Sequence, residues 1–91
     1  MRDRVLIVDD VEINREILKE ILQDEYKIMQ AGDGEEALQV IEQNQEDIAV
    51  VLLDLIMPKK DGYEVLEVLK KNKWLDNMAV LIISGESSVE T

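Results

Sequence analysis

The chain has 91 residues and a formal net charge of −11, because 21 Asp and Glu stand against only 10 Lys and Arg. A chain this short is expected to form one domain, and one this acidic is not expected to bind nucleic acid directly, since phosphate backbones attract clustered cations. It contains no Cys and no His, which excludes disulfides, thiolate or imidazole metal ligands and an imidazole base.

The first half of the chain alternates between strand and helix patterns. Residues 4–8 are expected to form the first strand, because Arg4 leads into a short apolar run, Val5 to Val8, that is typical of a buried strand. An amphipathic helix is expected over about residues 10–24, where apolar residues recur at helical spacing. These residues are Ile13, Ile17, Leu18, Ile21 and Leu22. A second strand is expected at 26–31, and Asp33 with Glu36 three residues later is typical of the capped start of another helix.

The second half continues the same alternation. The helix after Asp33 has an apolar stripe, which consists of Ala37, Leu38 and Ile41. The apolar run 48–53 predicts a third strand, and a third helix follows Gly62 with an inward stripe of Val65, Leu66 and Leu69. Residues 79–84 predict a fourth strand. The order β-α-β-α-β-α-β predicts an α/β fold, a doubly wound parallel sheet with helices on both faces.

The third strand leads directly into Asp54. Pro58 cannot donate to a strand ladder, so this strand must end before it, with Asp54 at its carboxyl end. Ligands of open α/β sheets bind at that edge. A single Asp in such a place is more often a turn former or a helix cap, so Asp54 alone would not indicate a site.

Two other strands also end in residues with side-chain oxygens. Asp9 and Asp10 follow the first strand, and Ser84 follows the fourth. Carboxylates brought together at one sheet edge require compensation, and Mg²⁺, with Mn²⁺ as a substitute, accepts such oxygen ligands. Asp54 could then act as a nucleophile that forms an aspartyl phosphate, while Ser84 donates its hydroxyl to a phosphoryl oxygen.

These motifs resemble the receiver domain of bacterial two-component response regulators. The resemblance rests on Val8-Asp9-Asp10, on Leu53-Asp54-Leu55-Ile56-Met57-Pro58 followed by Asp61-Gly62, and on Ile82-Ile83-Ser84-Gly85. It implies a flavodoxin-like receiver fold with strand order 2-1-3-4-5. It also implies a phosphorelay module that is not an enzyme in the ordinary sense, although a complete receiver promotes its own phosphorylation and dephosphorylation.

The resemblance implies a role for each site residue. Asp54 would accept a phosphoryl group from a histidine kinase or a histidine phosphotransfer protein. Asp10 and Asp54 would ligate Mg²⁺ directly, Asp9 would act largely through water, and the backbone carbonyl of Ile56 would be the third protein ligand. Ser84 would turn toward the phosphoryl group on activation.

Receivers also have a fifth strand that ends in a lysine, followed by a fifth helix. No residue here matches that lysine, and Lys59 and Lys60 are expected to face solvent. The sequence therefore predicts a partial receiver domain over residues 1–91, with strand order 2-1-3-4. Its strand 79–84 would be an apolar edge, through which the chain is expected to self-associate.

Two other functions are weighed against phosphotransfer. A phosphatase of the dehalogenase type also uses an Asp nucleophile with Mg²⁺, but it needs a second Asp at the position of Ile56. A receiver-like module that is not phosphorylated and works by binding or dimerisation fits the missing lysine. No signal peptide or 18-residue apolar run is present, so a cytoplasmic location without membrane contact is expected.

Overall fold

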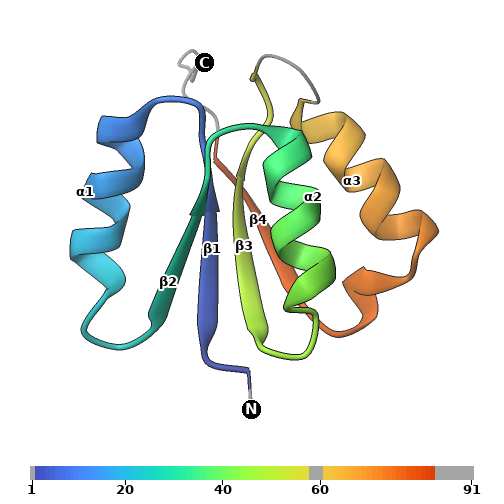
Figure 1. Cartoon of the computed structure of the whole chain (residues 1–91), viewed down its shortest axis with the longest axis horizontal. Helices are drawn as coiled ribbons and strands as arrows, with labels where there is room; N and C mark the ends of the chain where they lie inside the picture. The colour runs from blue at the N-terminus through green and yellow to red at the C-terminus, as the bar shows by residue number, and fades with distance from the viewer. Residues whose placement is uncertain (1, 58–60, 84–91) are drawn as a thin grey trace, which may run out of the picture.

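Figure 1 shows the computed structural model of the chain, which describes residues 2–57 and 61–83. Its elements follow the predicted alternation, with one short 3₁₀ helix in addition. They are β1 (Arg4–Val8), α1 (Glu12–Leu22), β2 (Lys27–Ala31), α2 (Gly34–Gln43), β3 (Ile48–Asp54), α3 (Gly62–Lys71), the 3₁₀ helix η1 (Trp74–Asp76) and β4 (Ala79–Ile83). None of the helices in the described ranges is long and apolar enough to cross a membrane.

The strands form one parallel sheet in the order β2-β1-β3-β4, as predicted. Each strand is connected to the next by a helix, because a parallel neighbour cannot be reached by a tight turn. In Figure 1 the strands point the same way, so their carboxyl ends lie together at the upper edge of the sheet. β1 and β3 are neighbours, and the residues that follow them meet at this edge.

Alternate residues of β1 face opposite sides of the sheet. Leu6 and Val8 belong to the larger core, against α2 and α3, whereas Val5 and Ile7 belong to a smaller one, against α1. This period of two is the expected geometry of a strand covered on both faces. The continuous apolar runs of the sequence therefore arise from burial on both sides.

The apolar stripe expected on α1 is wider than the surface that this helix buries. Leu18 and Leu22 pack on the sheet, but Ile13, Ile17 and Ile21 are 63%, 53% and 68% exposed. The three isoleucines are spaced four residues apart and follow one flank of the helix, away from the Leu18 flank. Helical spacing predicted the helix correctly but placed these isoleucines wrongly.

The helix starts were predicted to within two residues. At α2, the Asp33 carboxylate accepts from the Glu36 amide at 2.8 Å, as expected, and the Glu36 carboxylate accepts from the Gly32 amide at 2.8 Å. At α3, Asp61 and Glu64 form a reciprocal capping box, which was not predicted from the sequence.

β4 forms one edge of the described sheet. Among the described residues it pairs only with β3, and Leu81 and Ile82 are 56% and 46% exposed. The predicted strand extended to Ser84, which lies outside the described residues.

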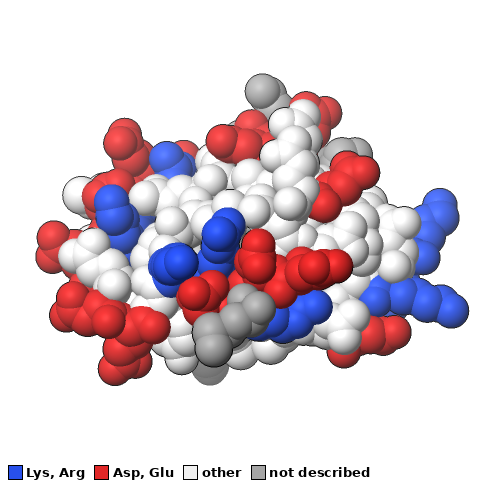
Figure 2. Space-filling model, turned by 60° about the horizontal axis from the view of Figure 1, so that its bottom comes forward, with Lys and Arg blue, Asp and Glu red and all other residues white. Residues whose placement is uncertain are grey.

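The charged side chains on the surface are mixed in sign. On the face shown in Figure 2, Lys and Arg are interspersed with Asp and Glu.

Candidate functional site

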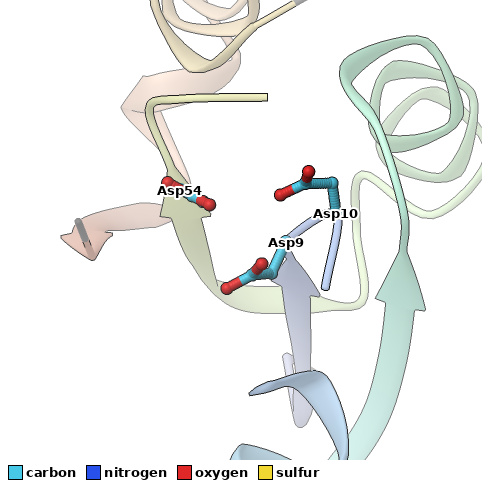
Figure 3. Close-up of side chains that lie close together, drawn as sticks. All are labelled: Asp9, Asp10 and Asp54. Carbon is cyan, nitrogen blue, oxygen red and sulfur yellow. The ribbon is translucent and has the colours of Figure 1, made fainter. Parts of the chain in front are cut away.

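Three carboxylates meet at the carboxyl edge of the sheet. Asp54 is the last residue of β3, and Asp9 and Asp10 directly follow β1. One carboxylate oxygen from each lies within 4.8 Å of the others, and Figure 3 shows the three side chains converging. Asp9 and Asp54 are only 5% and 6% exposed, whereas Asp10 faces solvent. The predicted acidic cluster is therefore present.

Burial raises the pKa of the Asp54 carboxyl above its ordinary value of 3.8, and the neighbouring Asp9 and Asp10 raise it further. The amide of Ile56 donates to Asp54 Oδ1 at 3.1 Å and opposes this shift, because it stabilises the ionised form. Ionising Asp54 in the folded chain is therefore more costly than ionising a free aspartate, and a nearby cation would offset that cost.

The donor set of the cluster consists of carboxylate oxygens. Hard divalent cations such as Mg²⁺ and Mn²⁺ accept these ligands and complete their shell with carbonyls, water or phosphate oxygens. A bound divalent cation would offset the repulsion that Asp54 meets on ionising. The three residues fit Mg²⁺ by the chemistry of their ligands and by their convergence.

Asp9 is held at each of its polar groups. Its amide donates to the Ala31 carbonyl at 3.1 Å, and its carbonyl accepts from Arg15 Nη1 at 2.7 Å. Its carboxylate oxygens accept from the Val11 amide at 2.9 Å and from Asn14 Nδ2 at 3.3 Å. Asp9 is thus fixed between β2 and the start of α1.

Neither Asn14 nor Arg15 was predicted to belong to the site. Both belong to α1, which was treated only as an amphipathic helix. Their polar side chains lie within one to two turns of the paired acids, and that position was the available signal.

The start of α3 packs directly on the end of β3. The amide of Gly62 donates to the Leu55 carbonyl at 3.1 Å. A β-carbon at Gly62 would lie 2.5 Å from the Asp54 carbonyl oxygen, a distance that side chains do not tolerate. Gly62 is therefore needed for this close approach, although its φ is not positive. The capping box of Asp61 and Glu64, with hydrogen bonds of 3.1 and 3.2 Å, fixes the same turn.

The remaining predicted site residues stay untested. The Ile56 side chain is 60% exposed beside Asp54, and its carbonyl as a metal ligand is still a prediction. Ser84, Lys59 and Lys60 lie outside the described residues.

Comparison with known proteins identifies the family. The profile described as "Response regulator receiver domain" matches residues 5–91. The chain is 38% identical over 87 residues to the response regulator MprA of Mycobacterium sp. (strain KMS), covering 94% of this chain and 36% of that protein. It is 38% identical over 72 residues to the chemotaxis protein CheY of Halobacterium salinarum, covering 78% of this chain and 58% of that protein. The chain thus spans less than two thirds of these relatives.

A solved structure agrees with the sequence relatives. The chemotaxis response regulator CheY4 of Vibrio cholerae matches with a TM-score of 0.84 and 28% identity, covering 97% of this chain and 72% of that one. The similarity confirms the flavodoxin-like receiver fold that the strand order indicated. The match over residues 5–91 and the shared fold show that the chain belongs to the response regulator receiver domain family, a family of two-component signalling domains.

Proposed function

We propose that residues 1–91 are part of a receiver domain in which Asp54 accepts a phosphoryl group in a two-component phosphorelay. The donor would be a phosphorylated histidine of a kinase or of a histidine phosphotransfer protein. The observation that carries this proposal is the placement of Asp54, buried at the end of a central strand and next to Asp9 and Asp10. A nucleophile that must react while ionised benefits from a nearby cation, and this cluster offers the ligands for one.

In the proposed step, a carboxylate oxygen of Asp54 attacks the phosphorus atom while the phosphorus–nitrogen bond to the donor imidazole breaks. The leaving imidazole nitrogen takes up a proton, and a carboxyl–phosphate bond remains on the receiver. Bound Mg²⁺ supplies positive charge that stabilises the transferring phosphoryl oxygens. The hydrogen bond from the Ile56 amide holds one oxygen of Asp54 and leaves the other to serve as the nucleophile.

The proposed metal ligands are Asp10, Asp54 and the Ile56 carbonyl, with Asp9 acting through water. Asp9 suits this indirect role because both of its carboxylate oxygens already accept hydrogen bonds. Ser84 is proposed to donate to a phosphoryl oxygen, which rests on the sequence motif alone. A complete receiver would also promote its own dephosphorylation.

The proposed partners are proteins that carry the donor histidine. Direct nucleic-acid binding is not proposed, given the net charge of −11 and the mixed charges in Figure 2. A cytoplasmic location remains a prediction that rests on the sequence. Self-association through β4 is proposed for the 91-residue polypeptide, because among the described residues β4 pairs only with β3 and exposes Leu81 and Ile82.

Chemical phosphorylation tests the proposal. The protein is incubated with a small phosphodonor such as acetyl phosphate and Mg²⁺, and hydroxylamine-sensitive label is measured. Asp54→Asn should abolish the label, whereas Asp24→Asn, at an exposed turn, should not. Label that survives Asp54→Asn would refute the assignment. Weak labelling is expected of the 91-residue chain, because no residue matches the family's lysine.

The same assay separates the alternatives. A binding module that is not phosphorylated would remain unlabelled even in a longer protein that contains the fifth strand. A phosphatase would instead turn over many equivalents of a phosphomonoester such as p-nitrophenyl phosphate. Ile56 stands where that phosphatase family needs its second Asp, so no such turnover is expected.

A further inference from the structure

Arg15 connects three parts of the chain near the acidic cluster. Its Nη1 donates to the Asp9 carbonyl at 2.7 Å, and its Nε donates to Gln30 Oε1, on β2, at 2.9 Å. Gln30 Nε2 in turn lies 3.4 Å from Glu16 Oε2, so Gln30 is held from both sides. Arg15 is half-buried, and its guanidinium donates from two edges of its rigid plane, a geometry that an ammonium cannot reproduce.

The carbonyl that Arg15 binds belongs to the peptide that joins Asp9 to Asp10. A peptide unit is planar, so holding this oxygen also sets the direction in which the chain leaves toward Asp10. Among the described residues, no side-chain hydrogen bond or ion pair restrains the exposed Asp10 carboxylate. Its placement toward Asp54 therefore depends on the backbone that Arg15 fixes.

We propose that Arg15, held by Gln30, is a positioning residue for the metal site, which orients Asp9 and Asp10 through their shared peptide. This inference rests on the proposed function, since it assumes that the cluster binds Mg²⁺. Residues that orient metal ligands from outside the ligand shell commonly change metal affinity by about 10–100-fold.

If Arg15 positions the metal ligands, its removal should weaken Mg²⁺ binding, which is the opposite of what its positive charge alone would cause. A cation near three carboxylates repels Mg²⁺, so removing Arg15 should strengthen binding if charge alone matters. Arg15 makes no ion pair within 4.0 Å to a carboxylate of the described residues; the two ion pairs there are Arg4–Asp47 and Lys27–Asp3. Its contact is with a carbonyl, and loss of that contact should weaken binding.

Calorimetric titration of Mg²⁺ at fixed ionic strength tests this. Arg15→Met is expected to bind about tenfold more weakly than wild type. Arg15→Lys keeps the charge but loses the two-sided contact, and it is expected to bind more weakly as well. Gln30→Met changes no charge and is expected to weaken binding by a smaller factor. Because both residues act through one contact, the double variant should be no weaker than Arg15→Met alone.

Two control variants replace an arginine and a glutamine that do not contact the acidic cluster. Arg4→Met deletes an arginine that contacts Asn44 and Asp47, far from the cluster along the sheet. Gln39→Met changes an exposed glutamine of α2. Both are expected to bind Mg²⁺ no more weakly than wild type. If Arg15→Met does not fold, Arg15→Lys and Gln30→Met test the same contact.

A second measurement needs no metal. The Val11 amide donates to Asp9 Oδ1. Its hydrogen exchange should be faster in Arg15→Met than in wild type and unchanged in Arg4→Met. If the wild type binds Mg²⁺ and both Arg15→Met and Gln30→Met bind it as tightly or more tightly, the positioning role of Arg15 is wrong, while the proposed metal site stands. A wild-type chain that binds no Mg²⁺ would instead overturn the proposed metal site, and this inference with it.

Discussion

Val8 and Leu53 are register partners in the neighbouring parallel strands β1 and β3, and an aspartate follows each of them. This register places Asp9 and Asp54 level with one another at the carboxyl edge of the sheet. A shift of one residue would turn every side chain of one strand to the opposite face. The apolar pattern that fills both cores therefore also determines that the acids converge.

The first prediction concerns the stability cost of Asp54. Its pKa is raised in the folded chain, so the folded state binds its proton more tightly than the unfolded state does. Ionised Asp54 should therefore destabilise the fold at neutral pH. Below the ordinary value of 3.8 the group is neutral in both states, and the cost should disappear.

Asp54→Asn should accordingly be more stable than wild type at pH 7 without metal, and the difference should vanish as the pH falls through the raised pKa. Urea unfolding at a series of pH values in a chelator measures this, with Asp24→Asn as an exposed control. A variant no more stable than wild type at pH 7 would contradict the account of Asp54.

The second prediction concerns Gly62. Gly62→Ala should destabilise the fold by about 1–3 kcal/mol, because the new methyl would overlap the backbone of Asp54 and Leu55. This cost exceeds the gain of about 1 kcal/mol that Ala usually brings to a helix. Gly32→Ala is the control, since its β-carbon would meet nothing closer than 3.4 Å. Equal unfolding midpoints for the two variants would refute the close-approach argument.

The third prediction concerns the metal ligands. Asp10→Asn should weaken Mg²⁺ binding by about tenfold or more, because it removes a charged ligand that faces solvent beside Asp54. Calorimetry or amide chemical shifts should report this. Asp24→Asn is the control, since it removes one negative charge at an exposed turn away from the cluster. If Asp10→Asn and Asp24→Asn bind Mg²⁺ equally well, Asp10 is not a ligand.

The fourth prediction concerns the edge strand. The 91-residue polypeptide should associate in sedimentation experiments, since β4 offers an unpaired apolar edge among the described residues. Ile82→Lys should reduce this association, because a charge at an exposed edge position disfavours pairing with another chain. A compact monomer that unfolds cooperatively would show that the edge does not recruit other chains.

The fold could be predicted from the sequence because its strands are short apolar runs and its helices show helical spacing. Asp9, Asp10 and Asp54 could be predicted as a cluster because the carboxyl ends of parallel strands share one edge. The exposure of Ile17 could not be predicted, since helical periodicity gives a face but not the width that the sheet covers. The position of Arg15 after the paired acids allows a contact with them, but which group it contacts depends on how α1 packs beside β2, which the sequence does not give.

Reductive trapping tests the central claim most directly. The protein is treated with a phosphodonor and Mg²⁺, then with borohydride, which converts an aspartyl phosphate to homoserine, and the product is mapped by peptide mass spectrometry. We expect homoserine at position 54, dependent on Mg²⁺ and reduced in Asp10→Asn at limiting Mg²⁺. Homoserine at position 9 or 10, or none in a longer protein that contains this chain and the fifth strand, would contradict it.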